Sequence, residues 1–327
     1  MRNGPYFITV LTVGLLASGL AAGAEPSVGI PHIGFLGMDS GMQAVRVAAL
    51  QDGLRELGYV DGRNIVIDYR WAEGRFDRLP QLAAELVAVK PRVIVTAAPA
   101  AVRAAQQATT TIPIVMLVHD PVGMGFVASL ARPGGNITGL AFQDSELSTK
   151  RLDLFRQAVP NLSRVAVLWN KEGGGGAGVD VVTSAARSLG FQVLALEVKE
   201  AGDFATAIAA AKSWGAQGLV QLASPFITTN RKILLDLLKA NHLPATCEVR
   251  EYVVEGCLMT YSADYNLLFR RLAYFVDRIL KGANPADLAI QQPREFDFVI
   301  NLDTAQALGL NIPSSLRMQA SENIPVH

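Results

Sequence analysis

The chain has 327 residues, of which half are hydrophobic and 18% are charged, so its composition is that of a globular protein with a sizeable core rather than a disordered one. The 29 lysines and arginines balance the 29 aspartates and glutamates, and they form no basic run. A nucleic-acid-binding groove needs an excess of positive charge on one face, so we expect no nucleic-acid partner.

The first residues are typical of an export signal. Arg2 is followed by an uncharged apolar stretch over residues 6–22, which leads into Ala22-Gly23-Ala24, the small-residue pattern of a signal-peptidase site. The stretch is shorter than the roughly 20 apolar residues that cross a bilayer, although an uncleaved anchor is the alternative. We therefore predict a signal peptide over residues 1–24 and a secreted, periplasmic mature protein.

From Ile30 onward, short β-branched runs alternate with stretches of helical period. The first part of the chain predicts strands at 32–36, 64–69, 92–96 and 114–118, and helices at 42–57, 79–89 and 100–108. Strand and helix in alternation are typical of a parallel sheet covered by helices on both faces.

The same alternation restarts after Gly139. It predicts strands at 164–169, 192–197, 218–222, 245–248 and 257–261, and helices at 179–189, 204–214, 230–241 and 266–280. The sequence therefore predicts an α/β fold with two doubly wound, parallel-sheet lobes. Ligands of such sheets bind beyond the carboxyl ends of the strands, so two facing sheets predict a cleft between the lobes.

The chain has two cysteines, Cys247 and Cys257. Export to an oxidising compartment permits a disulfide between them. The predicted strands, however, put them at opposite ends of neighbouring strands, where their Cα atoms are too far apart for the bond geometry, so we favour two buried thiols. Neither the spacing nor the four histidines suggest a metal site, and we expect no cofactor.

Five segments carry a family resemblance. The most specific one is TIPIVMLVHDPVGMGFVASLARPGGNITG at 111–139, and it is supported by Gly58-Tyr59 with Gly62 and Asn64, and by residues 69–74, 259–265 and 298–305. Together they resemble the ABC transporter substrate-binding proteins associated with uptake of tryptophan and other aromatic amino acids. The resemblance covers nearly all of the chain after the leader.

This resemblance implies a type I periplasmic binding protein fold, in which crossover hinges join the two lobes. It also implies a monomer that binds a small molecule, an amino acid or another solute, without catalysing a reaction. Its partners would be an ABC permease and its ATPase, with the membrane reached only through the permease.

We expect lobe 1 to contain residues 28–139 and about 263–290, and lobe 2 to contain 140–262 and about 291–327. The segment Pro133-Gly134-Gly135-Asn136 lies near the first of these boundaries. Glycine and asparagine adopt left-handed backbone conformations at low cost, so the segment is either a hinge or a plain tight turn.

Candidate ligand contacts in lobe 1 come directly after predicted strands. They are Met38, Asp39, Ala97, Ala98, Ala100, His119 and Asp120. The segment from Ala98 to Ala100 opens a helix whose first amides lack partners, which suits a ligand carboxylate or, alternatively, water. Asp120 precedes a proline and is equally explained as the start of a turn.

Candidates in lobe 2 occupy the corresponding positions. They are Asn170, Ser224, Phe226, Glu248, Tyr261 and Asp264. A ligand ammonium needs a carboxylate in a dry cleft, for which Asp264 is the first choice and Glu248 the second. The alternative role of Asp264 is to cap the helix that follows it. Tyr261 and Phe226 are either apolar walls of the cleft or part of the core.

The run Gly173–Gly176 departs from the family pattern, in which this loop is bulkier. Glycines have no side chain with which to contact a ligand, which argues against aromatic specificity. The run also lacks the Gly-Lys-Ser/Thr ending of a phosphate-binding loop.

Two other classes of function are compatible with the predicted fold. A Rossmann-like enzyme is disfavoured, because no G-x-G-x-x-G follows the first strand and no G-x-S-x-G elbow occurs. A ligand-binding partner of a periplasmic sensor or receptor uses the same fold and remains open.

Overall fold

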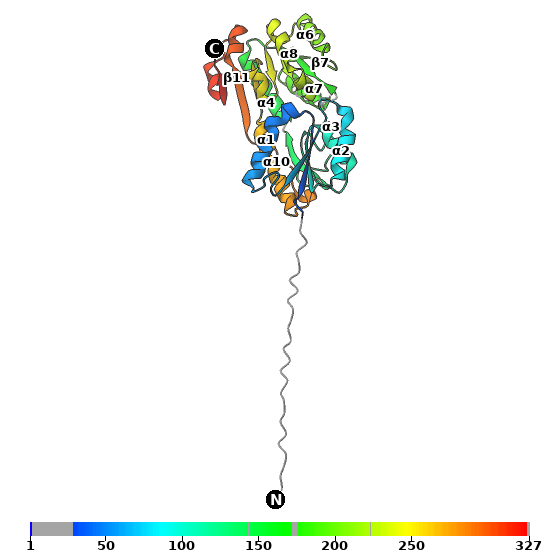
Figure 1. Cartoon of the computed structure of the whole chain (residues 1–327). Helices are drawn as coiled ribbons and strands as arrows, with labels where there is room; N and C mark the ends of the chain where they lie inside the picture. Colours follow the sequence, from blue (N-terminus) through cyan, green and yellow to red (C-terminus); the bar gives the residue numbers. More distant parts are fainter. Residues whose placement is uncertain (2–28, 143, 172–175, 223, 326–327) are drawn as a thin grey trace.

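The computed structural model of the chain describes Met1 and residues 29–142, 144–171, 176–222 and 224–325. These residues form two α/β lobes, each built on its own sheet (Figure 1). The predicted α/β fold with two lobes is therefore confirmed. Apart from Met1, the predicted signal peptide lies outside the described residues.

Lobe 1 is built on a five-stranded parallel sheet with the order β2-β1-β3-β4-β5. Its strands are β1 (His32–Gly37), β2 (Val66–Trp71), β3 (Val93–Ala97), β4 (Ile114–His119) and β5 (Ile137–Phe142). Because β2 and β3 lie on opposite sides of β1, the chain changes direction there, and a crevice forms at the carboxyl ends of β1 and β3.

Helices cover both faces of this sheet. The main ones are α1 (Ser40–Glu56), α2 (Leu79–Ala88), α3 (Pro99–Ala108) and α10 (Tyr265–Leu280), with short turns η1 (Phe76–Arg78) and η3 (Pro285–Asp287). Alternate residues of each strand enter two separate cores, one under α1 and α10 and the other under α2 and α3. Covered on both faces, β3 is buried at every position, which explains its continuous apolar run.

Lobe 2 is built on a seven-stranded sheet with the order β12-β11-β10-β9-β8-β6-β7. Its strands are β6 (Arg164–Trp169), β7 (Gln192–Glu197), β8 (Gly218–Gln221), β9 (Ala245–Cys247), β10 (Met259–Ala263), β11 (Phe296–Asn301) and β12 (Glu322–Ile324). Its helices are α4 (Asp144–Ala158), α5 (Gly176–Ser188), α6 (Asp203–Trp214), α7 (Pro225–Thr229), α8 (Arg231–Ala240), α9 (Arg250–Val254), α11 (Leu302–Ala307) and α12 (Ser314–Gln319).

The second sheet differs from the expected parallel one at a single pair of strands. β11 runs antiparallel to β10, with Ala263 opposite Phe296, whereas the other described pairs are parallel. The chain leaves lobe 2 at the carboxyl end of β10 and returns to lobe 2 at the same edge. The returning strand must therefore run in the opposite direction.

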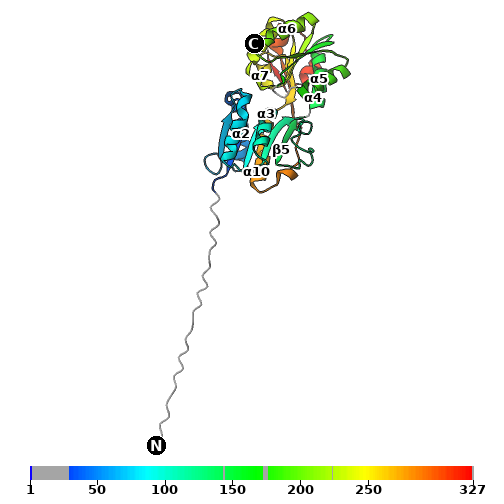
Figure 2. The ribbon, with the colours of Figure 1, turned by 90° about the vertical axis from the view of Figure 1, so that its right-hand side faces the viewer.

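Three segments of the chain cross between the lobes, and Figure 2 shows the two lobes from the side. The first follows β5, the second joins β10 to α10, and the third leads to β11 from Gln291, which is bridged to Leu140 of β5. The expected boundary at Gly139 falls inside β5, which pairs with β4 as far as Phe142. The first crossing therefore follows Phe142.

The segment from Pro133 to Asn136 lies at the amino end of β5, inside lobe 1. The Asn136 side chain donates to the carbonyl oxygen of Ile112 at 2.8 Å, and its own carbonyl oxygen accepts from the amide of Ile114. Gly134 has φ 81°, which a tight turn requires. The hinge interpretation is therefore wrong, and the segment is a turn.

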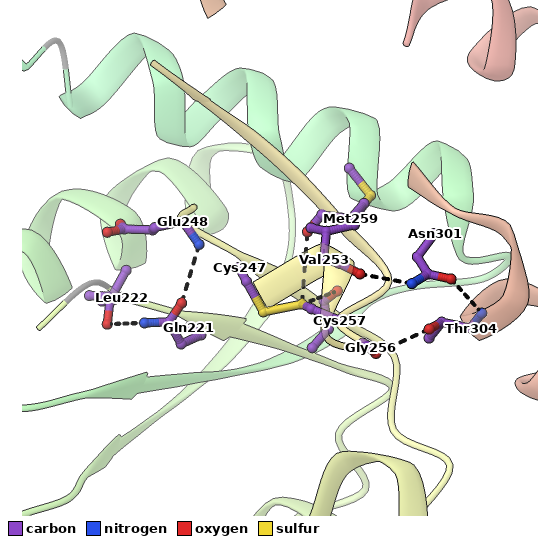
Figure 3. Close-up of a disulfide and its surroundings, with 11 residues drawn as sticks. Gln221, Leu222, Cys247, Glu248, Val253, Gly256, Cys257, Met259, Asn301 and Thr304 are labelled. Atoms are coloured by element: carbon purple, nitrogen blue, oxygen red, sulfur yellow. Dashed lines mark hydrogen bonds between the residues drawn. A yellow bond between two sulfur atoms is a disulfide. The ribbon is translucent and has the colours of Figure 1, made fainter. Parts of the chain in front are cut away.

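Cys247 and Cys257 form a disulfide with their Cα atoms 6.5 Å apart, so the expectation of two thiols is wrong (Figure 3). The error came from placing Cys257 inside a strand, whereas β10 begins at Met259 and Cys257 comes after the turn that ends α9. β9 pairs Thr246 with Met259, so one cysteine lies one residue after that pair and the other lies two residues before it. The helix α9 between them returns the chain to the starting edge of β10.

Candidate functional site

A pocket that is partly open to solvent lies between the two lobes at the carboxyl ends of the lobe 1 strands, and it encloses about 850 Å³ when the solvent at its mouth is included. We call it the main pocket. Lobe 1 contributes Met38, Asp39, Gln43, Arg46, Gly74, Ala97, Ala98, Pro99, Leu117, Val118, His119, Phe142, Tyr265 and Phe269. Lobe 2 contributes Ser224, Pro225, Thr228, Thr229 and Val249. Its mostly apolar lining with a few polar side chains is that of a small-molecule site.

The sheet order determines the position of this pocket. The residues after β1 and β3 flank the point at which the chain changes direction, and those at the ends of β4 and β5 extend the same wall. Of the predicted contacts, the structure brings together Met38, Asp39, Ala97, Ala98, His119 and Ser224. Ala100 instead lines a separate surface groove with residues 74–77.

Ala98 has a backbone conformation that is rare for a residue with a side chain. Its φ of 79° and ψ of 137° lie outside the regions that L-residues favour, and it directly precedes α3. Such a conformation costs roughly 1–3 kcal/mol and persists only where the surrounding structure enforces it. It turns the chain from β3 into α3, so that the first turn of α3 starts at the pocket wall.

Two polar residues of α1, Gln43 and Arg46, line the main pocket, and we did not predict either of them. Gln43 is 8% exposed, and its Oε1 atom has no hydrogen-bond partner. The Nε atom of Arg46 is also buried without a partner, and the guanidinium lies 4.6 Å from the centre of the Tyr265 ring. A signal was present, because Gln43 continues the apolar stripe of Val47, Leu50 and Leu54 along α1.

Three aromatic rings from different elements form one edge of the main pocket. His119 of β4 stacks on Phe142 of β5 with 4.3 Å between ring centres, and Phe142 lies 5.0 Å from Tyr265 of α10. Arg46 lies over the far side of this series, on the Tyr265 ring. These flat surfaces suit a planar apolar group.

A smaller pocket of about 300 Å³ adjoins the main pocket at the crossing segments. We call it the hinge pocket. It shares His119, Phe142 and Tyr265 with the main pocket and is also lined by Glu248 and Arg151. Arg151 is 6% exposed and Glu248 is 13% exposed, and they form an ion pair at 3.2 Å. The Glu248 carboxylate that we predicted for a ligand ammonium is therefore already paired with a cation of its own lobe.

Asp264 lines neither pocket. Its Oδ1 atom accepts hydrogen bonds from the amides of Asn266 at 2.7 Å and Leu267 at 3.1 Å, at the start of α10. This is the geometry of the capping role, which we considered as the alternative.

The remaining predicted residues also lie away from both pockets. Asp120, with φ 34°, accepts from the amide of Gly123, and buried Asn170 donates to the carbonyl oxygen of Val198. Phe226 stacks on Phe204 in the core under α6, and Tyr261 stacks on Phe296. Each has a role in the fold that explains its residue type.

Residues 172–175, which hold most of the glycine run, lie outside the described residues. In the part of the chain that the structure does describe, no cluster of His, Cys, Asp and Glu has the make-up of a metal site. None of the helices described is both long and apolar enough to cross a bilayer.

Comparisons with known proteins give one consistent family. A family model described as "ABC transporter substrate binding protein" matches residues 34–324. A tyrosine-binding protein of Clostridioides difficile (strain R20291) is 27% identical over 259 residues, which are 79% of this chain and 74% of that protein.

Two solved structures are similar over most of the chain. One is an ABC domain from Streptococcus pneumonia in complex with L-Trp, and the other is a conserved domain protein from Vibrio cholerae. Each is 25% identical, with a TM-score of 0.85, and each match covers 90% of this chain and 99% of the other.

Proposed function

This chain belongs to the ABC transporter substrate-binding protein family, and from that premise we propose that its main pocket binds an aromatic amino acid for import. The observation that carries the proposal is the lining of this pocket, which comes from both lobes and meets at the carboxyl ends of the lobe 1 strands. A solute held there contacts both lobes only when they are close together.

The aromatic part of the proposal is supported by the pocket and by the relatives. The rings of His119, Phe142 and Tyr265 offer flat surfaces for an aromatic side chain. The names of two relatives contain tyrosine and L-Trp. Burying the apolar part of such a solute stabilises the complex by about 25 cal/mol for each Å² of surface removed from water.

We also propose that the solute is bound without chemical change. The hydroxyls in the lobe 2 wall are used in local structure: Ser224 accepts from the amide of Ile227, Thr228 donates to the Ser224 carbonyl, and Thr229 donates to the Pro225 carbonyl. A hydroxyl nucleophile needs an adjacent base that takes its proton. In the hydrogen bonds just described, none of the three hydroxyls donates to a basic side chain.

The proposal extends to the location of the chain, its oligomeric state and its transport partners. The leader over residues 1–24 would direct the chain to the periplasm, where it would act as a monomer. It would deliver its solute to an ABC permease, and the ATPase of the same transporter would drive uptake. Radiolabelled uptake in cells with and without the chain is the direct measure of this step.

The binding proposal is tested by calorimetric titration of the protein from residue 25 onward with L-tyrosine, L-tryptophan, L-phenylalanine, L-lysine and ribose. We expect the three aromatic amino acids to bind and the other two not to bind. Thr229→Trp, at an exposed position in the pocket wall, should weaken binding at least ~10-fold by filling the space that the solute needs.

A matched control is Ile233→Trp, which adds the same side chain at a 40% exposed position of α8 outside the pocket. It should leave affinity unchanged. If no aromatic amino acid binds, or if both tryptophan variants bind as wild type does, the proposed function of the main pocket is wrong.

A further inference from the structure

The main pocket has an unusual distribution of charge. Arg46 is the one lysine or arginine among its described lining residues, and it comes from lobe 1. Many other arginines pair with carboxylates, as Arg70 does with Glu85 and Arg231 does with Glu255. Within the described ranges, no carboxylate forms an ion pair with Arg46.

We propose that Arg46 binds the carboxylate of the solute, so that the pocket selects aromatic carboxylates over the corresponding amines. This inference rests on the proposed function of the main pocket and names the group that the site requires. A guanidinium presents its N–H donors in a planar fork that matches a carboxylate, and the pairing is stronger in a desolvated pocket than in water.

The unpaired state of Arg46 supports a ligand role over a structural one. Its Nε atom is buried without a hydrogen-bond partner, and so is the Oε1 atom of Gln43 one turn earlier on α1. A charged group without a partner in a partly desolvated site destabilises the folded protein. Such a group is expected at a binding site, where an incoming anion supplies the counter-charge and the hydrogen-bond acceptors that the protein lacks.

The neighbours of Arg46 hold its guanidinium in place. It lies 4.6 Å from the centre of the Tyr265 ring, and a cation over an aromatic face is attracted by the ring quadrupole. Tyr265 is packed in turn against Phe142. The carboxylate would therefore bind beside the aromatic edge of the pocket, where the side chain of the same solute would stack.

The two carboxylates predicted for a ligand ammonium do not offer an equal site. Glu248 is paired with Arg151 and Asp264 caps α10. Asp39 also lines the main pocket, but on the same lobe as Arg46. A solute that lacks a carboxylate would leave the Arg46 charge enclosed without an anion, which makes amines the disfavoured class.

The test compares three solutes that share one ring: L-tyrosine, tyramine, which lacks the carboxylate, and 3-(4-hydroxyphenyl)propanoate, which lacks the ammonium. For wild type we expect tyramine to bind at least ~10-fold more weakly than L-tyrosine and more weakly than the propanoate. Arg46→Gln should weaken L-tyrosine binding by roughly ten- to a hundredfold and leave tyramine nearly unchanged.

The control variant is Arg103→Gln. Arg103 lies over the ring of Phe126 at 4.8 Å, in the same lobe and with the same kind of contact, but it lines neither pocket. It should bind all three solutes as wild type does. Arg46→Lys, which keeps the charge and loses the fork, should fall between wild type and Arg46→Gln, and it serves as the test if the glutamine variant does not fold.

The outcomes separate the two proposals. If wild type binds none of the three solutes and no aromatic amino acid, the proposed function fails and this inference fails with it. If wild type binds L-tyrosine but Arg46→Gln binds it within threefold, the inference alone is overturned. An equal loss for L-tyrosine and tyramine overturns it as well, because a purely structural role would weaken both.

Discussion

Asp264 stands at the second crossing between the lobes, directly before the helix that carries Tyr265. Its carboxylate accepts the amides of Asn266 and Leu267, which otherwise have no partner in the first turn of α10. A ligand-binding role and a capping role for this residue make different predictions, because asparagine caps a helix as well as aspartate does but carries no charge.

We expect Asp264→Ala to lower the free energy of unfolding by about 1 kcal/mol, in a range of roughly 0.5–2, and Asp264→Asn to lower it by no more than a few tenths. Neither variant should change solute affinity by more than about threefold. Urea denaturation and calorimetric titration of both variants measure the two effects. A tenfold loss of affinity in Asp264→Asn would instead assign the carboxylate to the solute ammonium.

Among single residues of the site, those that come directly after a strand could be predicted from the sequence. The carboxyl ends of parallel strands meet at one edge, so the sequence alone was enough to place Met38, Ala98 and His119 together. Gln43 and Arg46 lie inside a helix, and the position of Gln43 on the apolar stripe indicates burial but not what the side chain faces. α10 faces these two residues because the chain crosses back to lobe 1 after β10, and the alternation of strands and helices alone does not predict this crossing.

The contact between α1 and α10 supports the lobe 1 side of the site. One helix carries Arg46 and the other carries Tyr265, and the side chains of Arg270 and Glu56 join them as an ion pair. The backbones come close at Gly53, where an added Cβ atom would lie 2.4 Å from the carbonyl oxygen of Arg270. A glycine in the interior of α1 is therefore a requirement of packing.

Replacing Gly53 with alanine should lower the free energy of unfolding by roughly 1–3 kcal/mol, because the helices must separate to make room. This is the opposite of the usual effect, since alanine favours a helix by up to about 1 kcal/mol over glycine. Gly41→Ala in the same helix is the matched control. Its nearest neighbour would be the Asp39 side chain at 3.6 Å, so stability should be unchanged or slightly raised.

Thermal or urea unfolding of the two alanine variants gives the comparison directly. Equal stability of both would show that the two helices can move apart freely. In that case the position of Arg46 over Tyr265 would not depend on a close helix contact.

Elements with a regular pattern were predicted well from the sequence, and those defined by long-range pairing were not. The strands at 164–169 and 192–197 match β6 and β7 at both ends. β5 and β11 were missed, because β5 leads into the first crossing between the lobes and β11 follows the third, so both stand outside the regular strand-helix alternation. The disulfide was misjudged for a related reason, since the distance between its cysteines depends on how the chain at Cys257 approaches β9 before β10 begins at Met259.

The whole molecule is two lobes with a shared site between them. Each lobe has its own cores, and residues beside the first two crossing segments line the hinge pocket. Lobe 1 supplies the charged lining of the main pocket through Asp39 and Arg46, and lobe 2 supplies hydroxyl and apolar side chains. We infer that lobe 1 orients the solute and that lobe 2 closes over it.

Such a division predicts that the solute favours a closed arrangement, because only that arrangement gives it contacts with Val249 and Thr228 as well as with lobe 1. A ligand shifts such an equilibrium in proportion to its extra affinity for one state.

X-ray scattering should therefore give a smaller radius of gyration with L-tyrosine than without it, moving toward the ~19 Å of a compact chain of about 300 residues. At a solute concentration of 100 times Kd, binding should also add about 2.7 kcal/mol to the free energy of unfolding. Arg46→Gln, measured at a concentration that saturates only wild type, should stay closer to the unliganded radius, since compaction follows occupancy. Identical scattering with and without solute, in a sample that calorimetry shows to be saturated, would mean that the lobes do not move and that the pocket binds its solute in a fixed frame.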